Sequence, residues 1–356
     1  MTAPFGVYLH IPFCSRRCDY CAFATWSDRH HLHDEYLDAL SAEIAREVER
    51  GLPVASSVFV GGGTPSLVDP VRLANIVSSI PVTAGAEITI ECNPESVTDT
   101  HIASYVGAGV DRLSFGVQSL SAEVLVSLGR DHNPDTVTEA VALARAGGIE
   151  RLNLDLIYGG AGESIADWQH TIEQVIALDP DHVSAYALTV EAGTPLADDP
   201  SRHPEDDDQA DKYLLADSLL TSAGFINYEI SNWSKPEQEC AHNLLYWRQG
   251  NYRGFGCAAH SHQDGRRWWN VRTPDRYIDL ITSNGTVEAS AEELDSSRQR
   301  IEGLQLSLRT REGVPRSSLS DADINLLDPL IVVTEDIITL TTEGRLLANE
   351  VAVRLR

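Results

Sequence analysis

Long hydrophobic runs and positive charge are both scarce in this chain. No apolar segment among its 356 residues approaches the ~18–20 residues that are needed to span a bilayer. No basic residues precede the first apolar segment at Phe5, so no signal peptide is visible, and we expect a cytoplasmic protein without stable membrane insertion. Lysine and arginine number 27 against 53 acidic residues, a formal net charge of −26. Such a charge repels phosphate backbones, which excludes nucleic acid as an expected partner.

Cysteine is also sparse, with six residues, but three of the six lie close together near the N-terminus. A chain of this length without a secretion signal is not a disulfide scaffold. Clustered cysteines in such a chain more often bind metal or carry out redox chemistry. The remaining composition, 42% hydrophobic and 22% charged, is that of an ordinary globular protein. The length is compatible with two domains, or with one large α/β domain and an appendage.

Short apolar runs alternate with longer amphipathic segments through the first half of the chain. β-Branched or alternating residues predict strands at Phe5–Ile11, Ser57–Val60, Ala86–Glu91, Arg112–Gly116, Arg151–Leu156 and His182–Leu188. Apolar residues at helical spacing predict helices between them at Asp34–Arg50, Pro70–Ile80, Asp99–Val106, Pro134–Ala146 and Ser164–Ala177. These βα units in series favour a parallel sheet curled into a full or partial barrel. Periodicity alone leaves an open doubly wound sheet as the alternative.

The pattern changes near Glu191, where glycines, prolines and a run of acidic residues predict a boundary. We therefore expect a barrel over residues 1–190, a connecting region over 191–289 and a small α-rich C-terminal domain over 290–356. The connecting region is expected to hold a helix at Gln209–Ala223 and then an aromatic, glycine-rich stretch from Tyr228 to Trp269. The last domain is expected to end in a short hairpin and a helix, at Ile337–Leu340 and Glu343–Arg354.

The strongest functional signal is the spacing C-x3-C-x2-C at Cys14, Cys18 and Cys21. These cysteines directly follow a predicted strand, at the end where the active sites of βα barrels collect. Three thiolates in one loop can bind three irons of a 4Fe–4S cluster and leave one iron open to an external chelating ligand. A structural zinc site differs, because it needs four closed ligands. A zinc site completed by a distant histidine or cysteine, or unligated thiols, are the alternatives.

This motif after the first strand of a partial βα barrel resembles the signature of the radical S-adenosylmethionine (SAM) superfamily. The longer motif Y-x-H-I-P-F-C, from Tyr8 to Cys14, is similar to that of the oxygen-independent coproporphyrinogen III oxidase group, which contains the HemN oxidases and the HemW heme chaperones. The resemblance implies a partial (β/α)6 barrel with a smaller α-rich C-terminal domain. It also implies that the open iron binds the amino and carboxylate groups of SAM. An electron from the cluster would then break the sulfonium to give a 5′-deoxyadenosyl radical.

Polar or glycine residues stand just past successive predicted strands, which points to one site rather than to isolated polar positions. Glycines let a backbone approach a ligand closely, and an arginine can pair with a carboxylate. The resemblance assigns the SAM pocket to Tyr8, Tyr20, Gly62, Gly63, Thr64, Glu91, Gln118, Arg130, Asp155 and Thr189. Taken singly, the glycines could form a tight strand-to-helix turn, and Glu91 or Arg130 a barrel-end salt bridge. Ala161 departs from the pattern, because relatives usually have a proline in that loop.

Three features separate the two branches of this group. The oxidases carry a further cysteine two residues after the third, where this chain has Phe23, and a longer segment before the first strand. The segment His242–Trp247 matches the H-N-x-x-Y-W motif that marks the HemW-type proteins. The resemblance therefore implies a heme chaperone that binds a 4Fe–4S cluster, SAM and heme and transfers heme to an acceptor protein, with an electron donor if SAM is cleaved. The alternatives are an oxygen-independent coproporphyrinogen III oxidase and a radical SAM enzyme with another substrate.

Histidines within the aromatic stretch are the candidate heme ligands, because a neutral imidazole binds heme iron well and flat aromatic surface suits a porphyrin. His242 is the first candidate for the axial ligand, and His260 is the next. The alternative is that His242 and Asn243 only hydrogen-bond a loop, and that His260 packs in the core. The sequence names no catalytic residue.

Overall fold

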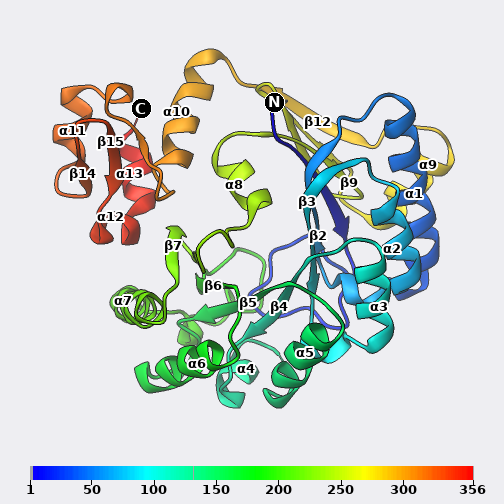
Figure 1. Cartoon of the computed structure of the whole chain (residues 1–356), viewed down its shortest axis with the longest axis horizontal. Helices are drawn as coiled ribbons and strands as arrows, with labels where there is room; N and C mark the ends of the chain where they lie inside the picture. Colours follow the sequence, from blue (N-terminus) through cyan, green and yellow to red (C-terminus); the bar gives the residue numbers. More distant parts are fainter. Residues whose placement is uncertain (1–2, 131, 356) are drawn as a thin grey trace.

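The computed structural model describes residues 3–130 and 132–355, and it is organised around one large curved sheet (Figure 1). The sheet has the strand order β12-β11-β10-β9-β1-β2-β3-β4-β5-β6-β8-β7. Its centre is a parallel series, β1 (Phe5–Ile11), β2 (Ala55–Gly62), β3 (Val82–Cys92), β4 (Arg112–Gln118), β5 (Arg151–Tyr158) and β6 (His182–Ala187). The six predicted strands are confirmed, and the curved sheet is a partial barrel rather than an open doubly wound sheet.

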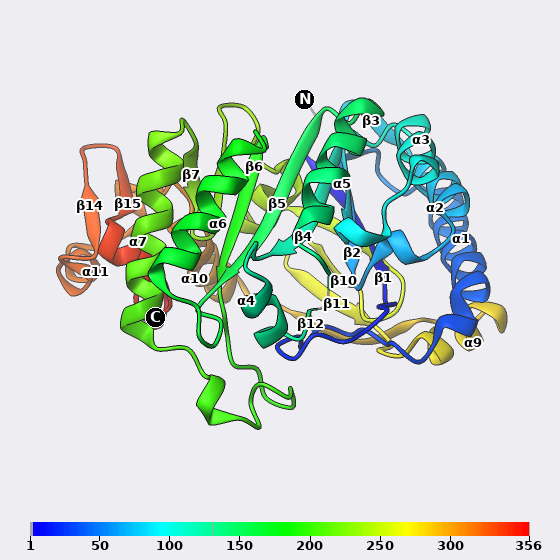
Figure 2. The same cartoon turned by 90° about the horizontal axis from the view of Figure 1, so that it is seen from below.

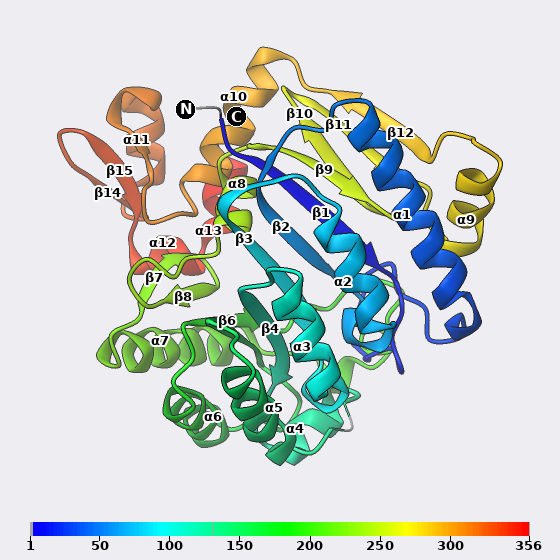
Figure 3. The same ribbon diagram turned by 45° about the vertical axis from the view of Figure 1, so that its right-hand side comes forward.

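Helices cover the outer face of the parallel strands. α1, α2 and α3 lie side by side over β1 to β3 (Figure 3), and α5, α6 and α7 cover the later strands (Figure 2). Their bounds are α1 His33–Glu49, α2 Pro70–Ser78, α3 Asp99–Gly107, α4 Ala122–Ser127, α5 Asp135–Ala146, α6 Ile165–Ala177 and α7 Asp206–Ser222. The predicted helices are confirmed to within a few residues. The six-residue helix α4 was missed, because it is too short to show a period.

Side chains alternate along β1 between the helix-covered outer face of the sheet, which is apolar, and the barrel interior, which is polar. In β1, Val7, Leu9 and Ile11 are fully buried in the main hydrophobic core, while Tyr8 and His10 alternate with them and face the barrel interior, where both line cavities. Successive side chains of a strand point to opposite faces. The interior of the barrel is therefore lined by hydrogen-bonding side chains, and this is where a polar ligand can be held.

Both edges of the parallel series are extended by residues of the predicted connecting region, and the last of these strands, β12, crosses its predicted end at residue 289. β8 (Asn232–Ser234) and β7 (Ile226–Glu229) continue the sheet beyond β6. β9 (Asn251–Phe255) pairs with β1, and β10 (His260–Gln263), β11 (Arg266–Asn270) and β12 (Glu288–Glu293) follow it in antiparallel order. The sequence did not predict these edge strands. Besides α7, the same region holds α8 (Ala241–Trp247) inside the curve of the sheet and α9 (Pro274–Thr282) against α1.

The C-terminal segment has its own hydrophobic core, which includes Leu304, Leu327, Ile338 and Val351. A three-stranded sheet of order β13-β15-β14 lies among short helices. The bounds are α10 Ser296–Ser307, β13 Val314–Pro315, α11 Asp321–Leu327, β14 Ile331–Val333, β15 Ile337–Leu340, α12 Thr342–Leu346 and α13 Ala348–Arg354. The hairpin is confirmed. The single helix predicted at its end is two short helices, because the backbone leaves the helical region at Leu347, where φ is −105° and ψ is 27°.

Short 3-10 helices complete the described chain, at His30–Leu32, Pro65–Leu67, Pro94–Ser96, Pro200–Arg202 and Arg316–Ser318. None of the helices within the described ranges is long and apolar enough to cross a membrane.

Candidate functional site

The three motif cysteines lie in one loop directly after β1. Each of Cys14, Cys18 and Cys21 is half-buried and carries a free thiol. The loop is held by its backbone, since Cys14 N–H donates to Trp26 O at 3.1 Å and Cys21 N–H to Cys18 O at 3.2 Å. Burial raises the pKa of Cys14, and the neighbouring thiols of Cys21 and Cys18 raise it further. The fold therefore gathers the three sulfurs at the carboxyl end of the first strand.

Donors from other elements point at these sulfurs. The Thr64 hydroxyl lies 3.8 Å from Cys14 Sγ, and Arg130 Nη1 lies 3.8 Å from Cys18 Sγ. Such donors favour the thiolate, which is the metal-ligating form. Within the described ranges, no three His, Cys, Asp or Glu side chains are grouped to hold one metal ion. Cysteines that ligate separate irons of a cluster do not need to converge on one ion, so the donor set fits the expected group.

The glycine turn after β2 is bonded to the cysteine loop. Gly63 N–H donates to Ile11 O at 2.8 Å, and Thr64 N–H to Phe13 O at 2.7 Å. Gly62 has a φ of +113°, and a Cβ there would meet the His10 ring at 2.4 Å. A Cβ on Gly63 would meet the Phe13 carbonyl oxygen at 2.5 Å. Only glycine fits both positions, so this turn brings bare backbone beside the cysteines.

Two acidic side chains face each other inside the barrel. Glu91 accepts a hydrogen bond from Gly62 N–H at 3.0 Å, and burial together with Asp155 raises the pKa of Glu91 to about 8. Asp155 accepts from the Ser114 hydroxyl at 2.7 Å and from Asn153 Nδ2 at 2.8 Å, and burial raises its pKa as well. Neither carboxyl has an ion-pair partner among residues 3–130 and 132–355, and both can accept hydrogen bonds from an ammonium group or from hydroxyls.

Arg130 supplies the positive charge on the other side. Its Nη2 donates to Asn93 Oδ1 at 3.2 Å and to Gly116 O at 3.0 Å. Its Nε is buried and has no hydrogen-bond partner in the described part of the chain. Burial opposes the charged form of Arg130, but Cys18 and Tyr20 outweigh it and raise the pKa of the guanidinium. A buried donor without a partner is costly, and a carboxylate is the ligand that a guanidinium pairs with best.

The remaining predicted SAM residues differ in how deeply they are buried. Tyr20 is half-buried beside Arg130 and Cys18. Burial and Cys18 raise the pKa of its phenol, and Arg130 opposes that shift. Gln118 is half-buried at a bulge between β4 and β5, with a φ of +65°. Thr189 is exposed just beyond β6, and its hydroxyl donates to Ala187 O at 3.3 Å. Its part in SAM binding stays a prediction. Asp131, which belongs to the Arg130 segment, lies outside the described residues.

A cavity of about 720 Å³ lies between part of the predicted SAM site and the antiparallel edge of the sheet. Tyr8, Gly62 and Glu91 line one part of it, and Ala22, Phe23 and Ala24 of the cysteine loop lie beside them. His10 connects the two groups, because its ring nitrogens bond the Tyr8 hydroxyl at 2.9 Å and the Ala24 carbonyl at 3.0 Å. The opposite wall comes from α8, β9, β10, β11 and α10. The volume of this cavity is that of a small-molecule binding site.

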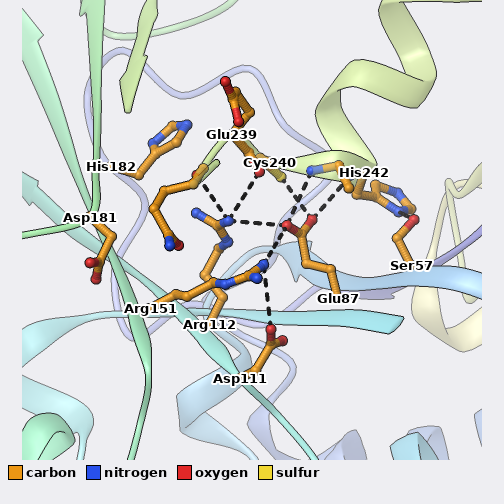
Figure 4. A network of polar contacts seen from close by, with 12 residues as sticks. Ser57, Glu87, Asp111, Arg112, Arg151, Asp181, His182, Glu239, Cys240 and His242 are labelled. Atoms are coloured by element: carbon orange, nitrogen blue, oxygen red, sulfur yellow. Dashed lines mark hydrogen bonds and ion pairs between the residues drawn. The ribbon is translucent and has the colours of Figure 1, made fainter. Parts of the chain in front are cut away.

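The helix that carries the H-N-x-x-Y-W motif enters the barrel from the end opposite to the cysteine loop. Its first residues are held by Glu87, which accepts from His242 N–H and Ala241 N–H, both at 3.1 Å (Figure 4). Arg112 Nη2 lies 3.0 Å from the same carboxylate. Burial opposes the charge of Glu87, but Arg112 and the helix N–H groups lower its pKa below the ordinary value. Glu87 is directly opposite Ser57 on β2, four residues before Glu91, which is about 13 Å along a strand.

His242 itself is buried with both ring nitrogens in hydrogen bonds. Nδ1 lies 2.9 Å from the Ser57 hydroxyl, and Nε2 lies 2.8 Å from the Tyr246 hydroxyl. Burial lowers the pKa of His242 to about 4, so its imidazole is neutral. Tyr246 lines the large cavity, whereas His242 lines a smaller internal one of about 140 Å³. Ligation of iron by His242 stays a prediction, and it requires one of these two bonds to break.

Sequence reasoning assigned no chemistry to the residues that link the parts of this site. His10, Asn93 and Glu87 each bond a residue of the cysteine loop, the arginine or the motif helix. The alternation of β1 and β3 could have indicated His10 and Glu87, since both stand in line with Tyr8 or Glu91 on the inner face. The wall formed by β10 and β11 could not be seen, because nothing in the sequence predicted that these strands extend the barrel.

Comparison with known proteins places the chain in a family. Residues 8–175 match the radical SAM superfamily. The heme chaperone HemW of Mycobacterium tuberculosis (strain ATCC 25618 / H37Rv) is 40% identical over 98% of this chain and 94% of that protein. HemW of Escherichia coli (strain K12) is 34% identical over 97% of this chain and 96% of that protein. The chain belongs to the HemW family.

The HemW family assignment confirms the resemblance seen in the motif from Tyr8 to Cys14. The coproporphyrinogen III oxidase HemN from Escherichia coli has a closely similar structure, with a TM-score of 0.87 over 99% of this chain and 90% of that one. Its sequence is 23% identical, so this likeness shows the fold alone. It confirms the partial barrel with a smaller C-terminal domain. As a radical SAM protein, this HemW-family chain is of a type that carries a 4Fe–4S cluster and SAM.

Proposed function

We propose that the chain is a cytoplasmic heme chaperone that binds a 4Fe–4S cluster, SAM and heme and transfers heme to an acceptor protein. The observation that carries this proposal is the cavity of about 720 Å³, which adjoins the cysteine loop on one side and an aromatic sheet face on the other. The name shared by its HemW relatives supports it. A radical SAM enzyme with a small substrate would not need such an aromatic wall beside its SAM residues.

Residues of this chain would hold the cluster and SAM as follows. Cys14, Cys18 and Cys21 would provide three thiolate ligands. The Arg130 guanidinium would pair with the carboxylate of SAM through Nε, which has no partner among the described residues. Glu91, as carboxylate, accepts from the amino group or from ribose hydroxyls. A bound cluster would supply an electron to SAM. An external electron donor would then have to reduce the cluster again.

Heme would occupy the aromatic part of the cavity. Phe23, which stands where the oxidases have a further cysteine, exposes 69% of its side chain and lines this cavity. An exposed aromatic residue beside a polar cofactor site is suited to a flat apolar ligand. His242 stays the sequence-based candidate for the axial ligand in this proposal.

The proposal is tested by comparing heme transfer with coproporphyrinogen turnover in one anaerobically reconstituted preparation. Heme-loaded protein is mixed with the apo form of a b-type heme protein, and the two are separated by size before their heme contents are measured. We expect heme to move to the acceptor. The same preparation, given SAM, a reductant and coproporphyrinogen III, is expected to yield no protoporphyrinogen IX. Sustained conversion to that product would overturn the chaperone proposal and identify an oxidase.

A further inference from the structure

One face of the antiparallel sheet extension is turned toward the large cavity. His260 pairs directly with Trp269, and His262 with Arg267 and Tyr252. Residues opposite each other on neighbouring strands share a face, and so do alternate residues of one strand. These five side chains therefore project from the same face, and all five line the cavity of about 720 Å³.

The histidines around this cavity differ in whether their ring nitrogens are available. His262 Nδ1 donates to Gly250 O at 2.9 Å, and its Nε2 accepts from Gly265 N–H at 3.2 Å. His10 and His242 likewise use both nitrogens. His260 is exposed, and its ring makes no hydrogen bond with any residue in 3–130 or 132–355. Among the described histidines of this cavity, His260 is thus the one whose imidazole can bind a metal without first losing a hydrogen bond.

The His260 ring is nevertheless held in place. It stacks on the Trp269 indole with the ring centroids 5.7 Å apart and the planes 26° from parallel. Partial burial of the ring and the nearby Arg267 charge lower the pKa of His260, which favours the neutral, iron-binding imidazole.

Two arginines beside this face differ in whether a described carboxylate pairs with them. Arg267 pairs with Glu292 at 2.7 Å and also with Glu302. Arg272 lines the same cavity, is exposed, and makes no ion pair or side-chain hydrogen bond with the residues that the structure describes. In a protein with a net charge of −26, most surface arginines can find a carboxylate. An unpaired guanidinium at the edge of an aromatic cavity suits a ligand that is flat and carries carboxylates.

We propose that heme binds against this sheet face, with the imidazole of His260 as its iron ligand and Arg272 as the partner of a propionate. This inference rests on the proposed heme-chaperone function, and it names the site and the ligand. Heme has a metal centre, a flat aromatic ring and carboxylates. These match the imidazole, the aromatic side chains and the guanidinium of this cavity wall. The geometry thus favours His260 over His242, which Tyr246 separates from the large cavity.

The test is a heme titration of anaerobically reconstituted protein, followed in the Soret band, for the wild type and for His260→Ala and His242→Ala. We expect His260→Ala to bind heme about tenfold more weakly or worse, with a changed Soret maximum that added imidazole restores. His242→Ala is expected to keep the wild-type spectrum. The matched control is His31→Ala, which removes an exposed histidine that does not line the cavity. Cluster absorbance and thermal unfolding show whether each variant is folded.

The charge of Arg272 is tested with heme and its propionate dimethyl ester. We expect the wild type to prefer heme, and Arg272→Ala to bind heme and the ester alike. Saturable wild-type binding with an unchanged spectrum in His260→Ala would overturn this inference and leave the chaperone function standing. Absence of saturable binding in the wild type would overturn the proposed function together with it.

Discussion

The imidazole of His10 lies against Gly62 so closely that a methyl group on Gly62 would meet its Cε1 and Nδ1 atoms at 2.4 Å. The parallel register of β1 and β2 puts these residues together, since His10 pairs with Gly61. His10 in turn bonds Tyr8 and the cysteine loop at Ala24. A change at Gly62 should therefore reach the loop that carries the cysteines.

We predict that Gly62→Ala lowers the free energy of unfolding by about 2–4 kcal/mol, from backbone strain at a φ of +113° and from the clash with His10. The matched control is Gly51→Ala, because Gly51 has a φ of +92° but nothing within 4 Å of an added Cβ. The control is expected to cost only the backbone term, about 1–2 kcal/mol. Urea unfolding of both variants measures the difference. Equal losses in the two variants would mean that the contact with His10 does not constrain the turn.

Arg130→Lys is predicted to weaken SAM binding about 10-fold to 100-fold while the positive charge is kept. A lysine cannot reproduce both the Nη2 bonds to Asn93 and Gly116 and the free Nε donor. Equilibrium dialysis with SAM under anaerobic conditions gives the dissociation constants. Arg50→Lys, on the exposed end of the first helix, is the control. An unchanged affinity in Arg130→Lys would remove this residue from the SAM site.

Glu91 is expected to make the unliganded protein less stable as the pH rises. Its pKa is about 8 in the folded state because of burial and Asp155, against an ordinary value of 4.5. Between these values the folded state keeps a proton that the unfolded state releases, so stability falls with rising pH through that window. Glu91→Gln cannot ionise and should be more stable than the wild type by about 2 kcal/mol at pH 8.5, and nearly equal to it at pH 5.

Urea unfolding at both pH values checks the prediction, with the exposed Glu49→Gln on α1 as control. Parallel pH profiles for the wild type and Glu91→Gln would show that Glu91 is ionised in both states.

The sequence predicts those features of the fold and the site that depend on residues close together in the chain. β1 was predicted at its observed ends, because Val7, Leu9 and Ile11 alternate with polar residues and fix one apolar face. The cysteine loop was located because three cysteines lie within eight residues. By contrast, the position of His242 depends on Ser57 and Glu87, which are remote in sequence. No local pattern contains that information.

The wall of the large cavity formed by β10 and β11 could not be predicted for the same reason. His260 and Trp269 lie opposite each other only because β10 and β11 form a hairpin that joins the barrel edge through β9. The aromatic composition of the segment indicated a flat ligand. Which face of the strands meets the cavity is set by register, and a shift of one residue would turn His260 away from it.

Cys18→Ser is predicted to abolish the brown absorbance of the cluster and to leave heme binding largely intact. The cysteine loop and the His260–Trp269 face are separate parts of one cavity wall, so removal of one ligand set should not remove the other. Ultraviolet–visible spectra before and after heme addition report both groups. Ser15→Ala, an exposed neighbour in the same loop, is the control. Loss of heme binding in a folded Cys18→Ser variant would mean that cluster and heme share one site.

The central claim is that this chain carries heme, and a heme titration of the anaerobically reconstituted wild type tests it most directly. The cavity of about 720 Å³, with one available imidazole in its described wall, predicts saturable binding near one heme per chain. Soret absorbance and size-exclusion chromatography measure stoichiometry and retention. A linear, non-saturating response, with heme lost from the protein on the column, would contradict the account.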